Sequence, residues 1–174
     1  MTDVSTGLRT FRNNRMLVNA LDSTHSHTHA GDFYSGGHHS LSVADDESLT
    51  LLVQAASEFH AQFSAVATGD CTVELYVGTT FSAAGTAVSM SNHRLDSANV
   101  SPVTVTHTPT VTANGTQFNG TELLAAGAKH SSGGGQAGFA NEVIIPAGYV
   151  LLLVVTNVSG GAVKMSLGVE GYKD

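Results

Sequence analysis

The residues best suited to chemistry in this sequence are histidines, and five of the nine lie between positions 25 and 39. Three alternate with Ser and Thr as His25, His27 and His29, and His38 and His39 follow. Imidazole nitrogen is a common zinc ligand, and alternate residues of a β-strand point the same way, about 7 Å apart at Cα. On a strand, His25 and His29 are about 13 Å apart, too far to share an ion. We therefore favour a polar or interface segment, and keep His25, His27 and His29 as weak metal-ligand candidates.

A His-x-His pair in a strand-rich chain invites comparison with the cupin metalloenzymes, and the comparison fails at two positions. Cupins place a glutamate three or four residues after the pair, whereas this chain offers only Asp32, at a shorter spacing. The Pro146-Ala-Gly148 motif is present, but Leu151 stands where a cupin has its liganding histidine. Leucine cannot bind a metal, so a cupin-like metal-binding protein is the third hypothesis, and we expect no cofactor.

Other sequence signatures of catalysis are missing. The Gly-rich stretch at 133–138 lacks the Gly-Lys-Ser/Thr ending of a phosphate-binding loop, and no Gly-x-Ser-x-Gly motif is present. The consecutive acids Asp45, Asp46 and Glu47 alternate around a turn and do not converge as an acid–base pair. Cys71 falls in phase with apolar neighbours, which predicts a small buried hydrophobe. We expect that the protein is not an enzyme.

Charge is unevenly distributed along the chain, which has a formal net charge of −7. Three of the arginines, Arg9, Arg12 and Arg15, lie in the first fifteen residues, and the rest of the chain is acidic. An acidic balance disfavours nucleic acid as a partner. A short basic arm is typical of a segment that docks on an acidic surface, so Arg9, Arg12 and Arg15 are the predicted docking residues.

The apolar runs of the sequence are short. None has the length of a signal-peptide core near the N-terminus, and none is long enough to span a bilayer. We expect a soluble protein that does not interact with membranes and is not secreted by the general route.

After residue 40 the chain divides into short β-branched or alternating segments separated by turn residues, and no amphipathic helix is expected. The strand-like segments are Ser48–Ala56, Glu58–Val66, Cys71–Val77, Thr86–Ser91, Ser101–Thr106, Pro109–Thr112, Asn141–Ile145, Tyr149–Thr156 and Ala162–Glu170, and Glu122–Ala126 is a short apolar run. They make about eight strands. Their spacing is typical of a sandwich. We predict an all-β, antiparallel β-sandwich, with a jelly roll as first choice of topology. Residues 1–40 form an N-terminal arm and His-rich entry segment, and residues 41–174 form the sandwich.

Five stretches of this sequence carry a resemblance to a known family: the entry segment 25–34, which ends in Ala-Gly-Asp-Phe-Tyr, and the segments 72–88, 92–94, 109–116 and 141–157. They resemble tailed-bacteriophage head decoration, or capsid cement, proteins with a jelly-roll fold. Together they cover most of residues 25–172. These stretches are strand and turn patterns, and none is a catalytic signature.

The resemblance implies a structural virion protein that binds the outer surface of a phage capsid and stabilises contacts between capsomers. It implies a symmetric homo-oligomer, with a trimer favoured, whose partners are the major capsid protein and itself. Such a protein is made in the host cytoplasm and located on the virion. For the oligomer interface we expect His25, His27, His29, Phe33 and Tyr34. At a symmetry axis, three copies of a histidine converge on one ion or form a buried ring.

The alternative function is a phage head fibre or a carbohydrate-binding β-sandwich adhesin. Glycan sites generally present exposed aromatic side chains, and this chain has only four Tyr and seven Phe. Most of the Phe residues fall in phase with buried faces. The candidates for a sugar-binding platform are Phe33, Tyr34 and Tyr172.

Overall fold

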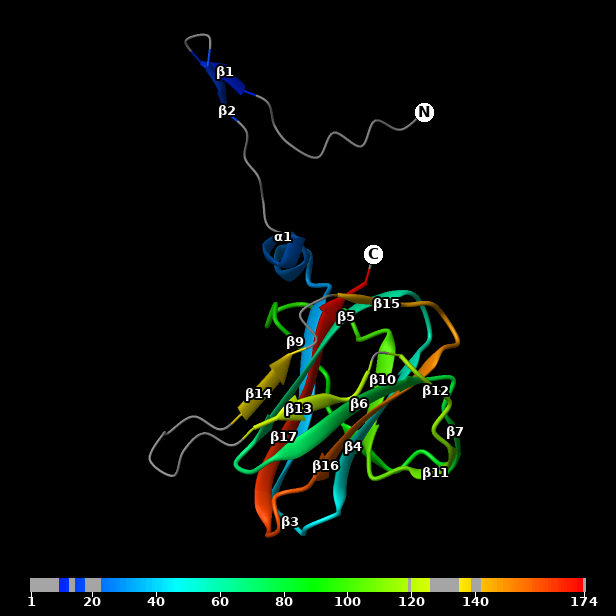
Figure 1. Cartoon of the computed structure of the whole chain (residues 1–174). Coiled ribbons are helices and arrows are strands. Elements are labelled where there is room, and N and C mark those ends of the chain that lie inside the picture. Colours follow the sequence, from blue (N-terminus) through cyan, green and yellow to red (C-terminus); the bar gives the residue numbers. More distant parts are fainter. Residues whose placement is uncertain are drawn as a thin grey trace.

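The computed structural model describes residues 10–12, 15–17, 23–118, 120–125, 135–138 and 142–173. It is an antiparallel β-sandwich with a short helix across one end (Figure 1). The predicted all-β, antiparallel fold class is confirmed.

The larger sheet has seven strands, and every strand pair in it is antiparallel. Its order is β12 (Thr116–Gln117), β6 (Cys71–Val77), β16 (Val150–Asn157), β4 (Ser48–Ala55), β10 (Val103–His107) and β8 (Thr86–Val88), with β13 (Glu122–Leu124) also paired to β6.

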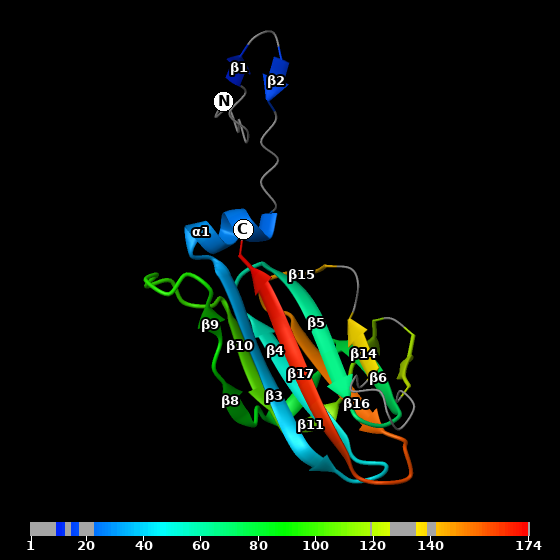
Figure 2. The same cartoon turned by 90° about the vertical axis from the view of Figure 1, so that its left-hand side faces the viewer.

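The smaller sheet has six strands and packs face to face with the larger one. Its order is β14 (Gly135–Gly138), β5 (Phe59–Ala67), β17 (Val163–Tyr172), β3 (Phe33–Val43) and β9 (Ser91–Asn92), with β15 (Val143–Ile145) also paired to β5. Figure 2 shows the long strands β3, β17 and β5 side by side, with the helix lying across their upper end.

The remaining elements are small. Two separate two-stranded sheets are formed by β1 (Thr10–Arg12) with β2 (Arg15–Leu17), which are consecutive, and by β7 (Thr80–Ala83) with β11 (Thr110–Ala113), which are distant in sequence. The helix α1 (Ser23–Ala30) precedes β3.

The chain changes sheet at each connection between its long strands. Strand β3 belongs to the smaller sheet, β4 to the larger, β5 to the smaller and β6 to the larger, and the same alternation runs through β15, β16 and β17. The first strand of this series, β3, pairs with the last, β17. This strand order supports the jelly-roll topology, which stays a prediction.

The core is filled by the side chains that alternate inward from both sheets. In β5 the residues Phe59, Ala61, Phe63, Ala65 and Ala67 are buried, while the intervening residues are more exposed. The same period of two runs through β17. Because successive strand residues point to opposite faces, a polar residue at every second position leaves one face for the core.

Two expectations need correction. Strand β3 is paired along its length with β17, so the sandwich begins at Phe33 and not at residue 41. The segment Ser23–Ala30 is helical, although no helix was expected. Its sequence, STHSHTHA, has no apolar stripe, and hydrophobic periodicity is the signal by which helices are recognised.

Candidate functional site

The helix α1 ends in a Schellman arrangement at Gly31. The amide of Gly31 donates to the carbonyl of Thr28 at 3.1 Å, and the amide of Asp32 donates to the carbonyl of His27 at 2.9 Å. Gly31 has φ +76°, which is the left-handed conformation that glycine adopts most readily. A glycine directly after the last helical residue is a stop signal for a helix, and Gly31 is in that position after Ala30.

The carbonyl of Gly31 is a meeting point for side chains from the segment 92–99. It accepts hydrogen bonds from Asn92 Nδ2 at 2.7 Å, Asn99 Nδ2 at 3.2 Å and Ser97 Oγ at 3.4 Å. A buried carbonyl gains stability from such donors because it has lost its contact with water. The last turn of α1 is therefore fixed to a loop that is more than sixty residues away in sequence.

Charged side chains add further links at the same place. Arg94 Nη1 donates to the carbonyl of His29 at 2.6 Å, and Arg94 Nε pairs with Asp96 at 2.8 Å. Asp32 accepts from Lys173 Nζ at 3.1 Å and from Asn99 Nδ2 at 3.0 Å. We call Ser23–Asp32 the arm root, since it joins the N-terminal arm to the sandwich and is held by three separate parts of the chain.

Three aromatic rings connect the arm root to the smaller sheet. His27 stacks on Tyr172 with ring centroids 4.0 Å apart, and Tyr172 stacks on His60 at 4.7 Å; both pairs are inclined by only 14°. The three rings come from α1, β17 and β5, and His60 and Tyr172 are directly paired in register. This stack docks the helix on the end of the sheet.

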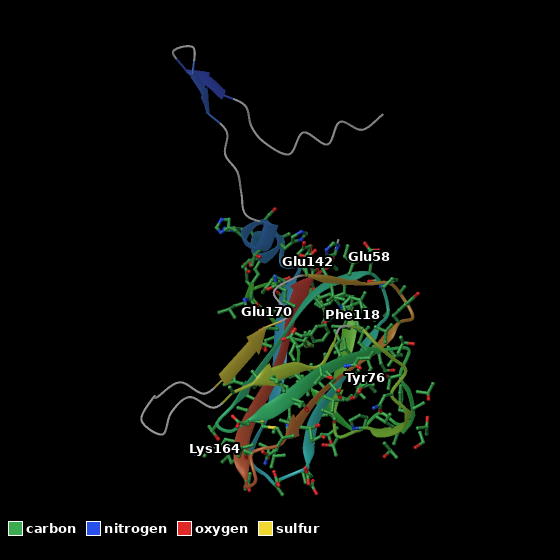
Figure 3. All side chains as sticks on the ribbon, viewed as in Figure 1. Glu58, Tyr76, Phe118, Glu142, Lys164 and Glu170 are labelled. Atoms are coloured by element: carbon green, nitrogen blue, oxygen red, sulfur yellow. The ribbon has the colours of Figure 1, made fainter. Side chains whose placement is uncertain are left out.

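Glu142 holds the far end of the stack. One carboxylate oxygen lies 2.5 Å from His60 Nδ1, and the other accepts a hydrogen bond from the Tyr172 hydroxyl at 2.9 Å. The hydrogen bond with His60 is the main reason that the pKa of Glu142 lies below its usual value. His60 Nε2 is buried without a hydrogen bond among the described residues, 3.8 Å from Glu58. Glu58 and Glu142 both lie near the helix end of the molecule in Figure 3.

A small cavity of about 200 Å³ lies beside the stack. Its lining includes His60, Gln62, Glu142, Glu170 and Tyr172. Two residues of this lining carry a hydroxyl, Thr24 and Tyr172, and the Tyr172 hydroxyl is hydrogen-bonded to Glu142. Through its bonds to both His60 and Tyr172, Glu142 orients the stack.

The histidines of the entry segment do not share one environment. His27 is partly buried in the stack, whereas His25 and His29 are exposed. The ring centroids of His25 and His29 are 4.5 Å apart, in an edge-to-face arrangement. The strand-based separation of about 13 Å was wrong, because residues four apart on a helix lie on the same face.

A second histidine cluster joins the two sheets. The rings of His38, from β3, and His107, from β10, stack with centroids 3.6 Å apart and an angle of 4°. Both side chains point toward the opposite sheet, since His38 pairs with the core residue Leu167 and His107 with the core residue Leu51. The sequence signal for His107 was a lone histidine at a strand end, which predicts nothing about its partner.

The remaining predicted site residues fall in two groups, the arginines of the arm and the aromatic residues Phe33 and Tyr34. Arg9 lies outside the described residues, and for Arg12 and Arg15 only their backbone pairing across β1 and β2 is described. Phe33 is 7% exposed and Tyr34 is 1% exposed, so the chain's own core leaves little of either side chain for a subunit interface or a sugar. No group of three or more His, Cys, Asp or Glu side chains in the described part of the chain is placed to hold a metal ion.

Comparison with protein-family models, with curated proteins and with solved structures found no match. No helix among the described residues is long and apolar enough to cross a membrane.

Proposed function

We propose that this chain is a structural protein that binds the outer surface of a tailed-phage capsid as a homotrimer and stabilises contacts between capsomers. The observation that carries the proposal is the fixed arm root. Hydrogen bonds to Gly31, the Asp32–Lys173 ion pair and the His27–Tyr172 stack hold the base of a basic arm at one end of an acidic sandwich. The partner of the arm is the major capsid protein.

A fixed root matters because it sets where the arm leaves the sandwich. An arm that starts from a defined point samples a smaller volume than one on a free linker, so its effective concentration at a neighbouring site is higher. In a closed lattice each additional contact is effectively intramolecular and adds to the avidity of the whole shell. Arg9, Arg12 and Arg15 supply the charge for this contact.

The sandwich also has an open apolar depression of about 420 Å³, where Phe118, Ile144 and Tyr149 are partly exposed. Leu95, Val100, Leu123 and Leu41 are exposed singly, between 71% and 97% in the isolated chain, which is normal for a protein surface. The depression is therefore the apolar feature of the sandwich that supports a role in protein assembly.

The two alternative functions find less support in the geometry. A glycan site needs exposed aromatic faces, but Phe33 and Tyr34 are buried and Tyr172 is stacked between His27 and His60. The cupin-like metal site needs a ligand at Leu151, which is 2% exposed and belongs to the core.

The direct test is whether the chain is a component of phage particles. Particles are purified from a culture that produces the chain, and its copy number relative to the major shell protein is measured by quantitative mass spectrometry. A fixed, stoichiometric ratio that persists through gradient purification supports the proposal. Absence of the chain from particles overturns it.

A further inference from the structure

We propose that His25 and His29 form a two-histidine chelating site for a divalent transition-metal ion of the zinc type. The site is separate from the proposed capsid role. Both residues lie on one face of α1, one helical turn apart, with their ring centroids 4.5 Å apart.

The distance between the rings suits a shared ion. Two imidazole nitrogens bound to one tetrahedral zinc at 2.0–2.1 Å are about 3.3 Å apart. The edge-to-face rings reach that separation by rotation about side-chain bonds alone, because both side chains are exposed and the described residues give neither ring another aromatic partner. Histidines four apart on a helix bind zinc in this way in metalloproteases.

His27 does not belong to the His25–His29 site. It lies on a different face of α1, and its ring is stacked at 4.0 Å on Tyr172. On a strand all three histidines would share one face, because alternate residues point the same way. On a helix His25 and His29 share a face and His27 lies on another. The helical register is therefore what assigns the ligands.

The positively charged side chains nearest to His25 and His29 are paired with carboxylates, so they do not prevent a cation from binding there. Arg94 lies against the carbonyl of His29, but its guanidinium is paired with Asp96 at 2.8 Å. The cation Lys173 is paired with Asp32 at 3.1 Å. The chain as a whole has a formal net charge of −7, which favours the approach of a divalent cation.

The ligand set selects the class of metal. Neutral imidazole suits Zn²⁺, Cu²⁺ and Ni²⁺, whereas Ca²⁺ and Mg²⁺ require oxygen ligands. Two histidines leave the other coordination positions to water, so the site binds an exchangeable ion. An ion across one helical turn also stabilises α1, which at eight residues is shorter than helices that are stable in isolation.

The test is a Zn²⁺ titration of the full chain, purified without an affinity tag, by calorimetry at neutral pH. Single substitutions His25→Ala and His29→Ala should each weaken zinc binding by about tenfold or more, because each removes one of two ligands. Alanine is the best helix former, so these variants retain the helix. Ca²⁺ in place of Zn²⁺ should give no binding at this site.

Two controls make the result specific. His27→Ala and His39→Ala each remove one histidine from the same region and should change the zinc affinity by less than about threefold, within the scatter expected for residues outside the site. Cu²⁺ bound to the chain should show two nitrogen ligands by electron paramagnetic resonance, and one in His25→Ala. Absence of zinc binding by the unmodified chain overturns the site, and so does an equal loss of affinity in His27→Ala and His25→Ala.

Discussion

The stacked rings of His38 and His107 join the two sheets of the sandwich, with their centroids 3.6 Å apart. Each ring comes from a different sheet and points toward the other. Burial is the main reason that the pKa of His38 lies below its usual 6.5, and His107 and His39 lower it further. The pair stacks best when both rings are neutral, because protonation places like charges face to face.

We therefore expect acid to weaken this part of the fold. A histidine whose pKa is lowered by folding binds fewer protons in the folded state than in the unfolded state. The stability that it contributes is complete above pH 6.5 and is lost as the pH falls below that value toward the lower pKa of the folded state. A double-mutant cycle with His38→Ala and His107→Ala should give a coupling energy on the order of 1 kcal/mol at pH 7.5.

At pH 5 the same coupling energy should be smaller or of opposite sign. The coupling energy is measured by urea unfolding, at both pH values, of the unmodified chain, the two single variants and the double variant. A matched cycle between His38 and Leu95, which is 97% exposed and has no described contact with His38, should give no coupling at either pH. A His38–His107 coupling that is the same at both pH values contradicts the expectation.

The conformation of Gly31 predicts that Gly31→Ala destabilises the arm root. A Cβ at this position meets the Cβ of Ser97 at 2.8 Å, and φ is +76°. Strain and displacement of the 92–99 segment together should lower the free energy of unfolding by about 1–3 kcal/mol. The substitution should also speed up hydrogen exchange of the amides in α1 and leave exchange in β16 nearly unchanged.

Gly160→Ala is the matched control for this change. Gly160 has φ +78°, but a Cβ there meets no atom within 4 Å. Gly160→Ala should lower the free energy of unfolding by about 1–2 kcal/mol, because alanine is strained in the left-handed conformation. It should leave hydrogen exchange in α1 unchanged. If both variants behave alike, the contact with Ser97 does not matter.

The carboxylate of Glu142 predicts a second pH effect, at lower pH. Its pKa is lowered in the folded state, chiefly by the hydrogen bond with His60, so the stability that it contributes is present above its usual 4.5. That stability is lost as the pH falls through the lower pKa of the folded state. Glu142→Gln should cost about 1 kcal/mol at pH 7 and reduce the slope of stability against pH below 4.5.

Unfolding measured between pH 3 and pH 7 tests this expectation. Glu170→Gln is a suitable control, because Glu170 lines the same cavity and its carboxylate, unlike that of Glu142, makes no hydrogen bond to His60 or Tyr172 in the described part of the chain. It should leave both the stability and its pH dependence nearly unchanged. Equal effects of the two substitutions speak against a specific role of Glu142.

The basic arm predicts salt-sensitive attachment to capsids. Replacement of Arg9, Arg12 and Arg15 by Gln should reduce the retained fraction of the chain on particles, and should also weaken its dependence on salt, since surface ion pairs are screened. Co-sedimentation between 50 and 500 mM salt measures both. Deletion of residues 1–16 should abolish binding and leave the unfolding transition of the sandwich in place.

Lys164→Gln is the control for loss of a surface cation. Lys164 lies at the opposite end of the molecule from Glu142 and the arm root (Figure 3). Its replacement should leave attachment unchanged. Unaltered attachment of the Arg variant removes the docking role of the arm and leaves the sandwich as the docking surface.

Part of the fold is a local property of the sequence. Strand β6 has the predicted bounds Cys71–Val77, and β4, β5, β16 and β17 differ from their predicted ranges by a residue or two. Alternation with a period of two and turn residues at the strand ends are sufficient to locate such strands. The buried state of Cys71 was predicted from the same alternation and is confirmed.

The candidate site was less accessible to prediction. The run of histidines was recognised, but its helical form was not, because α1 is held by Gly31, Asp32 and His27 contacts to distant segments and not by an apolar stripe. No sequence pattern links His60 with Glu142, since each is an ordinary polar residue of a strand or a loop. Only their spacing in the folded chain, 2.5 Å between His60 Nδ1 and Glu142, makes them a pair.

The sequence by itself determined the positions of β4, β5, β6, β16 and β17 to within a residue or two, and that charge separates a basic arm from an acidic body. These features depend on residues that are neighbours along the chain. The sequence did not reveal β3, which is defined by its pairing with β17. The tertiary structure alone decided that His25 meets His29, that His27 stacks on Tyr172, and that His38 meets His107. Such meetings depend on the register between distant strands and on the packing of one sheet against the other, which no local pattern encodes.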